Sequence, residues 1–233
     1  MKSIGIIWAG NFWKFMELHL KKYTSVYMFD KDDSNEILQK TCSQDVIIFA
    51  VPFSSLENAI KMTKLYIEEN TLIIDVSSIK EKPLILLQRN FPKNPIIGTH
   101  PMFWPESWKG WISNLPIVTM NISAPTETYT SLQNFLSKKL KLRLIEKTAE
   151  EHDKEMAYVQ WLSHFIGRAL NHLNIKDSDI ATSSYKHLLT LKNLLKNDSW
   201  ALFETIENWN NYTAELRLKF MKELEEIENK LWK

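Results

Sequence analysis

Short apolar runs alternate with helix-like segments along the first 147 residues. The helical stretches are expected near residues 12–22, 33–41, 55–68 and 125–138. The apolar runs are rich in Ile and Val and nearly continuous, and they occupy residues 3–8, 25–30, 45–52, 71–77, 95–100 and 115–120. Strands of this kind are buried on both faces, as in a parallel sheet. The order of strand and helix therefore predicts an α/β fold with a doubly wound parallel sheet over residues 1–147.

The pattern changes after about residue 147, where no further run typical of a strand appears. Thr148, Ala149, Glu150 and Glu151 form a capping-box sequence that predicts the start of a long helix. The chain ends in a charged amphipathic segment near residues 212–232, with apolar residues at helical spacing. We therefore expect a second, all-helical domain over residues 148–233, small enough to need a partner that covers its apolar faces.

Composition excludes several classes of protein. The 233 residues carry a formal net charge of +1, so no strong field favours nucleic acid or an anionic membrane. Cys42 is the only cysteine, which excludes an internal disulfide framework and a Cys-rich zinc site. No stretch approaches the roughly 20 apolar residues of a membrane span, and the N-terminus lacks the pattern of a signal peptide. We expect a cytoplasmic protein without a metal.

The beginning of the chain has the arrangement of a dinucleotide-binding, Rossmann-type domain. A strand leads through a turn at Gly10 into a helix, whose N-terminus favours a pyrophosphate, and the second strand ends at Asp30. A carboxylate there would bind a ribose 2′-hydroxyl and repel a 2′-phosphate, which favours NAD over NADP, although Lys31 weakens this inference. The alternative is a solvated acid at the end of a strand. The residues expected to contact the cofactor are Gly10, Asn11, Phe12, Asp30, Val51 and Pro52.

The glycine fingerprint of such domains is incomplete. The pattern G-x-G-x-x-G reads here Trp8-Ala9-Gly10-Asn11-Phe12-Trp13, so only the middle glycine is present. The first glycine normally makes the tight turn, and the third allows the helix to pack closely on the strand. A tryptophan at either place is expected to block the turn or to fill the phosphate site.

Three further segments resemble those of prephenate and arogenate dehydrogenases in order and spacing. They are Asp75-Val76-Ser77-Ser78-Ile79-Lys80-Glu81, Gly98-Thr99-His100-Pro101-Met102-Phe103 with the residues after it, and the helical segment from Glu151-His152-Asp153 to His164-Phe165. The resemblance implies an NAD(P)-dependent oxidoreductase of tyrosine biosynthesis. Such an enzyme converts prephenate to 4-hydroxyphenylpyruvate, or arogenate to tyrosine, with loss of CO2.

The resemblance also implies catalytic roles. The hydride leaves a ring carbon whose hydroxyl must lose a proton, and a neutral histidine can accept it. His100 matches the family's base and lies beyond the carboxyl end of a strand, where open α/β sheets bind ligands. Ser78 matches a serine that holds this histidine and the substrate hydroxyl. The alternatives are a structural histidine, and a serine that only caps a helix through the sequence Ser78 to Glu81.

Substrate contacts are expected from the long helix. Asp153, Gln160 and His164 are spaced seven and four apart, so they share one face. By resemblance His164 contacts the substrate and His152 lies near the site; hydrogen bonds between helices are the alternative for both. The family also uses an Arg to clamp a substrate carboxylate.

At the position of that Arg the alignment has Asn193. The candidates to replace it are the neighbouring Lys192 and Arg168, and the exact substrate is therefore open. In the family, the helical part forms a homodimer and covers the active site, so we expect a homodimer here.

Tryptophan is abundant and glycine scarce. There are nine tryptophans and five glycines, where an average usage of about 7% would give roughly 16 glycines. Tryptophan stands at several positions where the family has glycine or another small residue: Trp8, Trp13, Trp104, Trp108, Trp161 and Trp209. Such changes at sites of positive φ or close approach are costly. One hypothesis is that UGA codons, read here as tryptophan, are read as glycine in the source; Trp111 matches a genuine family tryptophan.

Three alternatives to a prephenate dehydrogenase stay open. The first is an arogenate dehydrogenase, because the two substrates differ only in a keto or amino side chain. The second is a dehydrogenase of another small acid on a related two-domain scaffold. The third is a non-catalytic, dehydrogenase-like binding protein whose nucleotide fingerprint has degraded.

Overall fold

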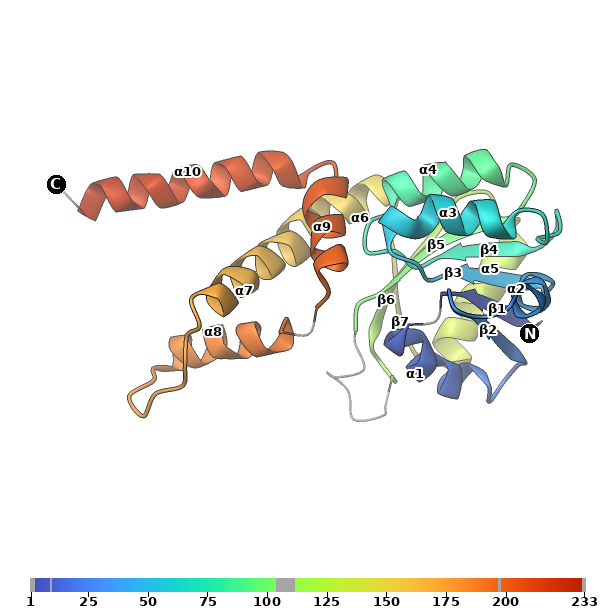
Figure 1. Cartoon of the computed structure of the whole chain (residues 1–233), viewed down its shortest axis with the longest axis horizontal. Coiled ribbons are helices and arrows are strands. Elements are labelled where there is room, and N and C mark those ends of the chain that lie inside the picture. The colour runs from blue at the N-terminus through green and yellow to red at the C-terminus, as the bar shows by residue number, and fades with distance from the viewer. Residues whose placement is uncertain (1–2, 9, 104–111, 197, 232–233) are drawn as a thin grey trace. The chain divides into compact units, whose positions relative to one another are not determined.

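A computed structural model describes residues 3–8, 10–103, 112–196 and 198–231. The chain divides into two compact units, Met1–Ala149 and Glu150–Lys233 (Figure 1).

The first unit is built on a seven-stranded sheet of order β2-β1-β3-β4-β5-β6-β7. The strands are β1 (Ile4–Ile7), β2 (Val26–Phe29), β3 (Val46–Phe49), β4 (Leu72–Asp75), β5 (Ile96–Pro101), β6 (Pro116–Asn121) and β7 (Arg143–Glu146). The first five strands are parallel to one another. Their carboxyl ends therefore meet at one edge of the sheet, which is where such folds bind ligands.

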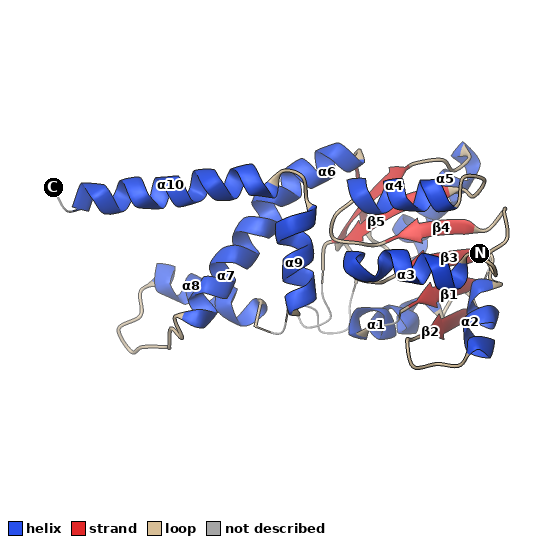
Figure 2. Cartoon of the chain, turned by 45° about the horizontal axis from the view of Figure 1, so that its top comes forward, coloured by secondary structure: helices blue, strands red, loops and turns tan. Residues whose placement is uncertain are grey.

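Helices cover both faces of this sheet (Figure 2). They are α1 (Asn11–Leu20), α2 (Asn35–Cys42), α3 (Phe53–Thr63), α4 (Glu81–Asn90) and α5 (Thr126–Asn134), the last continued by a π-helical segment, Phe135–Lys139. Side chains of α1 and α5 pack with Ile4, Ile6 and Ile48 on one face of the sheet. Side chains of α2, α3 and α4 pack with Ile47 and Phe49 on the other. The predicted doubly wound α/β fold is thereby confirmed.

The structure corrects the prediction in three places. Strand β6 runs antiparallel to β5, and β7, which the apolar pattern did not predict, pairs parallel with β6. Helix α4 was absent from the expected helices. It begins at Glu81, with Lys80 at its N-cap and no side-chain cap, so the capping role considered for Ser78 is wrong.

The second unit is helical. It contains α6 (Ala149–Met156, which begins at the unit boundary), a π-helical segment (Ala157–Trp161), α7 (Leu162–His172), α8 (Ser183–Leu194), α9 (Trp200–Trp209) and α10 (Thr213–Leu231). Thr182 and Ser199 cap α8 and α9 by accepting hydrogen bonds from the backbone N–H groups of Tyr185 and Leu202. The ring of Trp161 stacks on Phe165, and Phe220 of α10 packs edge-on against both. None of the helices described in either unit is long and apolar enough to cross a membrane.

Candidate functional site

A buried polar network joins the ends of β4 and β5. Asp75, the last residue of β4, is fully buried and accepts hydrogen bonds from Ser77 Oγ at 2.5 Å and from the ammonium of Lys80. The same ammonium, also fully buried, donates to the carbonyl oxygen of Thr99 at 2.7 Å. Thr99 Oγ1 in turn donates to the carbonyl oxygen of Asp75 at 3.2 Å. A charge without a partner is costly in the interior, so this network fixes the two strand ends relative to each other.

The two predicted catalytic residues directly adjoin this network. His100 follows Thr99 on β5, is buried, and lies opposite Val118 of β6. Ser78 follows Ser77 in the bend after β4 and is half-buried. Since β4 and β5 are adjacent and parallel, the structure brings His100 and Ser78 to neighbouring strand ends.

Asp75, Lys80 and Thr99 were not among the residues predicted for this site from the sequence. The signal was present, because an aspartate ends an apolar run and a lysine follows it five residues later. Charged residues in such a place need each other as partners if the segment is buried.

The residues predicted to hold a dinucleotide lie at the ends of β1, β2 and β3. Gly10 is the N-cap of α1 and is exposed, and a β-carbon added to it would meet no atom of the described residues within 4 Å. Asp30 follows β2, is half-buried, and accepts a hydrogen bond from the backbone N–H of Lys31 at 2.8 Å. Val51, buried, and Pro52, exposed, follow β3 and lead into α3.

Asn11 and Phe12 open α1. The half-buried ring of Phe12 contacts those of Trp13 and Phe103, with centroids 5.3 and 5.8 Å apart. The first turn of this helix carries no acidic residue. The positive N-terminus of α1 and a carboxylate after the second strand suit a dinucleotide.

The tryptophans at positions 8 and 13 do not suit a dinucleotide. Trp8 occupies the turn before Gly10 with a φ of 71°, in the left-handed region that glycine favours. Trp13 is buried on the side of α1 that faces the sheet. The first and third positions of the fingerprint therefore disagree with the rest of the predicted nucleotide site.

In the helical unit, His164 is a buried, neutral histidine. Burial, and then the nearby charge of Arg168, lower its pKa to about 4. Its Nδ1 atom lies 3.3 Å from Oδ2 of Asp198. Because the imidazole is uncharged at neutral pH, this contact is between a neutral ring and a carboxylate.

Arg168 and Lys192, the two candidates for the carboxylate clamp, have different surroundings. The Arg168 guanidinium lies over the rings of Trp200 and Phe203, 5.3 and 4.9 Å from their centroids, and donates to the carbonyl oxygen of Asp198 at 3.3 Å. The Lys192 ammonium donates to the carbonyl oxygen of Ile175. The structure thus brings Arg168 together with His164, one helical turn away and beside the same Asp198.

The other two predicted substrate contacts are less informative. His152 is buried, and its Nδ1 atom is 2.8 Å from Oδ1 of Asp153. Both residues belong to α6, so this contact lies within one helix and is not the bond between helices that the alternative interpretation expects. Gln160 is half-buried in the π-helical segment. Among the residues described in both units, no cluster of three His, Cys, Asp or Glu side chains could hold a metal ion.

Comparison with known proteins gives a consistent result. The profile of the prephenate dehydrogenase nucleotide-binding domain matches residues 19–112, and that of the TYRAAT1-like C-terminal domain matches residues 169–233. Arogenate dehydrogenases 1 and 2 of Arabidopsis thaliana are 27% and 28% identical over 99% of this chain. A Methanocaldococcus jannaschii protein named "Probable arogenate/prephenate dehydrogenase" is 30% identical over 83% of it. The chain spans 39%, 70% and 45% of these three relatives, respectively.

Solved structures share the fold. Prephenate dehydrogenase from A. aeolicus, in complex with hydroxyphenyl propionate and NAD+, matches with a TM-score of 0.77 and 14% identity, over 98% of this chain and 90% of that one. Synechocystis arogenate dehydrogenase matches with a TM-score of 0.70 and 16% identity, over 99% of this chain and 93% of that one.

Proposed function

The chain belongs to the prephenate and arogenate dehydrogenase family, and on this premise we propose that it is a prephenate dehydrogenase of tyrosine biosynthesis. Prephenate would lose a hydride to a nicotinamide dinucleotide and then CO2, which leaves 4-hydroxyphenylpyruvate. The observation that carries this proposal is the position of His100 and Ser78 at neighbouring strand ends, each beside the buried Asp75–Lys80 network.

In this proposal His100 accepts the proton of the ring hydroxyl as the hydride leaves. Proton transfer to a positioned histidine typically raises the rate of a reaction by about 10²- to 10⁴-fold. Ser78 orients the imidazole and the substrate hydroxyl. The network supports both residues through the backbone, since Ser77 and Thr99 are their immediate neighbours.

Arg168 is our candidate for the carboxylate clamp. Its planar fork suits a carboxylate better than the point charge of the Lys192 ammonium does, although each of the two groups already donates to one backbone carbonyl oxygen. The neutral His164 beside it can donate or accept a hydrogen bond without adding a charge. Gln160 and His152 are the remaining candidates for substrate contact.

Arogenate is the second candidate substrate. The Arabidopsis relatives that match nearly the whole chain are named arogenate dehydrogenases. The two substrates carry the same ring and ring hydroxyl, so the roles of His100 and Ser78 would be unchanged. Assays with each substrate separate the two possibilities.

NAD is the proposed cofactor, and NADP is the less favoured one. Asp30 follows β2 at the place where a carboxylate binds the ribose 2′-hydroxyl and repels a 2′-phosphate. Titration with each dinucleotide tests this preference. Tighter binding of NADP than of NAD would contradict it.

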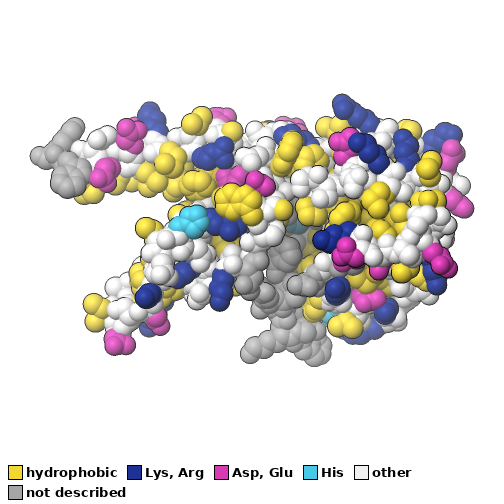
Figure 3. All heavy atoms as spheres, viewed as in Figure 1, with side chains coloured by type: hydrophobic (Ala, Val, Ile, Leu, Met, Phe, Trp, Pro, Cys, Tyr) yellow, Lys and Arg dark blue, Asp and Glu magenta, His cyan; other side chains and the backbone are white. Residues whose placement is uncertain are grey.

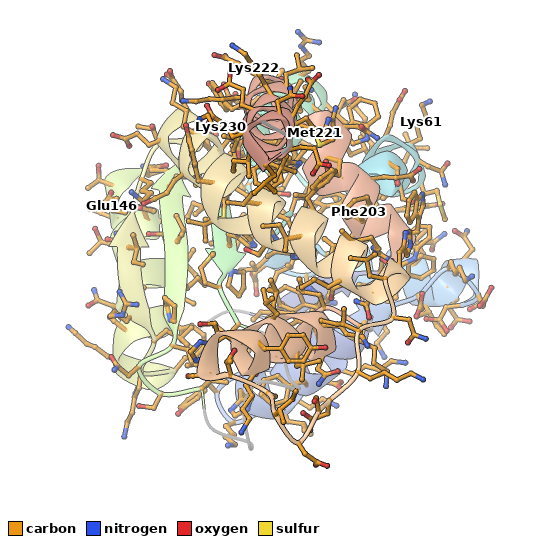
Figure 4. The ribbon with its side chains drawn as sticks, turned by 90° about the vertical axis from the view of Figure 1, so that its left-hand side faces the viewer. Lys61, Glu146, Phe203, Met221, Lys222 and Lys230 are labelled. Carbon is orange, nitrogen blue, oxygen red and sulfur yellow. The ribbon has the colours of Figure 1, made fainter. Side chains whose placement is uncertain are left out.

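A second copy of this chain is the proposed partner. One side of α10 exposes Met221, Leu224, Ile227 and Leu231, between 45% and 74% of each side chain, at spacings of three and four residues. Figure 3 shows hydrophobic side chains along this helix, and Figure 4 labels Met221 with the charged Lys222 and Lys230 of the same helix. An apolar stripe of this kind favours a helix-to-helix interface between copies.

The experiment that tests the proposed function compares two histidine variants. Prephenate and arogenate turnover with NAD is measured for the printed sequence and for the version with glycine at positions 8, 13, 104 and 108. In whichever version is active, His100→Asn should lower kcat by at least about 100-fold. The exposed His187→Asn variant should retain activity. If neither version turns over either substrate, the proposed function is wrong.

A further inference from the structure

The backbone at residue 8 has the conformation of a glycine. Trp8 has a φ of 71°, and among the described non-glycine residues only Asn114, Lys141 and Asn174 also have positive values. Asparagine tolerates this region because its short side chain bonds locally, whereas a bulky residue there is a genuine outlier. The turn is also held on both sides: the Trp8 N–H donates to the carbonyl oxygen of Phe29 at 2.7 Å, and its own carbonyl accepts from Gly10 at 3.0 Å. The side chain thus conflicts with a conformation that the strand and the turn impose.

A second, independent observation concerns residue 13, around which the packing is imperfect. Trp13 lines an apolar cavity of about 50 Å³ between α1, α5 and the sheet, together with Ile4, Met16, Leu132 and other core residues. Protein interiors contain few voids larger than a water molecule. A glycine at this position of the fingerprint normally lets the helix backbone approach the strand. The Trp13 indole lies in the space between α1 and the sheet that a closer approach of the helix would close.

Another tryptophan at a family small-residue position shows no such conflict. Trp161 has helical backbone angles and is fully buried. Its indole N–H donates to Oε2 of Glu207 at 2.5 Å. Residues 8 and 13 therefore differ from residue 161 in conflicting with their surroundings. Trp104 and Trp108 lie outside the described residues.

We infer that residues 8 and 13 are glycine in the protein that the cell makes, because their codons are UGA and are read there as glycine. The dinucleotide-binding turn is complete only in that form. Glycine removes the β-carbon from the left-handed position at residue 8, and at residue 13 it lets α1 pack closely on the sheet. The inference rests on the proposed function only in that both require a dinucleotide.

The coding DNA gives the first test. TGA at codons 8 and 13, with TGG at codon 111, is the expected result. TGG at codons 8 and 13 would overturn the inference. Because TGA could also be read as tryptophan, a second test on the protein is needed.

The second test compares Trp8→Gly/Trp13→Gly with the printed sequence. Without cofactor, the double variant should have a higher thermal midpoint, although replacing a buried tryptophan by glycine normally destabilises a protein. Calorimetric titration with NAD should give a Kd at least tenfold lower. A lower midpoint, or an unchanged NAD affinity, would overturn the inference.

The exposed Trp200→Gly is the matched control, and it should neither raise the midpoint nor tighten NAD binding. Turnover separates this inference from the proposed function. A double variant that binds NAD tightly but oxidises neither prephenate nor arogenate would support the inference and contradict the function.

Discussion

At the scale of single residues, the strongest constraint is the buried pair of Asp75 and Lys80. Both side chains are fully buried, and each has its charge balanced by the other. Removal of one partner leaves an uncompensated charge, which typically costs about 3–5 kcal/mol. We therefore expect Lys80→Met to lower the free energy of unfolding by about this amount, measured by urea denaturation.

The double variant Lys80→Met/Asp75→Asn is the control for this prediction. It removes both charges, so it should be more stable than the sum of the two single changes indicates. A double-mutant cycle measures that difference. Additive losses would mean that the two groups do not depend on each other.

His164 should make stability depend on pH. Its pKa is lowered from 6.5 to about 4 in the folded protein. Between these values the unfolded chain binds a proton that the folded chain does not, so the free energy of unfolding decreases as the pH falls through this window. The decrease should reach up to roughly 3 kcal/mol.

Substitution of the histidine tests this dependence. His164→Asn removes the titrating group and should flatten the decrease between pH 6.5 and 4, as measured by urea denaturation at several pH values. His187→Asn, at an exposed position of α8, should keep the slope of the parent protein. Equal slopes for the two variants would refute the assignment to His164.

At the scale of elements, two glycines of the nucleotide-binding segment should respond differently to alanine. A β-carbon on Gly5 of β1 would lie 2.0 Å from the carbonyl oxygen of Thr41 in α2. Backbone cannot yield cheaply at this distance, so Gly5→Ala should lower the free energy of unfolding by at least about 1–3 kcal/mol. The β-carbon of Gly10→Ala would meet none of the described atoms within 4 Å, so this change should cost less than about 1 kcal/mol.

Chemical denaturation measures both changes, and the same two proteins can be titrated with NAD. Gly10→Ala should weaken NAD binding while stability is retained, because in the proposed site the backbone at that position would approach the pyrophosphate. If both alanine variants were equally stable, the close contact between β1 and α2 would not be a constraint on the fold.

Most of the elements could be predicted because their apolar pattern is local. All six apolar runs became strands, and the final amphipathic segment became α10. Strand β7 was missed because its two end residues, Arg143 and Glu146, are exposed and leave only Leu144 and Ile145 as an apolar signal. The reversed direction of β6 could not be predicted, since the direction of pairing depends on tertiary contacts and not on an apolar run.

The site was predictable to a different extent. His100 and Ser78 were predicted as site residues from motifs that resemble those of a family, and their roles stay predictions. The network that joins Asp75, Lys80 and Thr99 connects two strands, so it was evident only once their pairing was known. The bond from Lys192 to the Ile175 carbonyl likewise depends on how the loop between α7 and α8 folds.

At the scale of the whole molecule, the exposed apolar side of α10 argues for self-association. A helix that is solvated on all sides does not need Met221, Leu224, Ile227 and Leu231 on one side. Burial of this stripe against a second copy would remove it from water in both chains, which favours a dimer. We expect a dimer by light scattering coupled to size exclusion.

Charge placed in this stripe should separate the copies. Met221→Glu/Ile227→Glu puts carboxylates where the second chain would pack, and burial of an unpaired charge opposes association. The variant should elute as a monomer, and its thermal midpoint should no longer rise with protein concentration, whereas the parent midpoint should. Leu65→Glu, at a side chain that is 87% exposed in the first unit, is the matched control and should remain a dimer. If Leu65→Glu and the double variant dissociated alike, the interface would not lie on α10, because a general effect of added negative charge would explain both results.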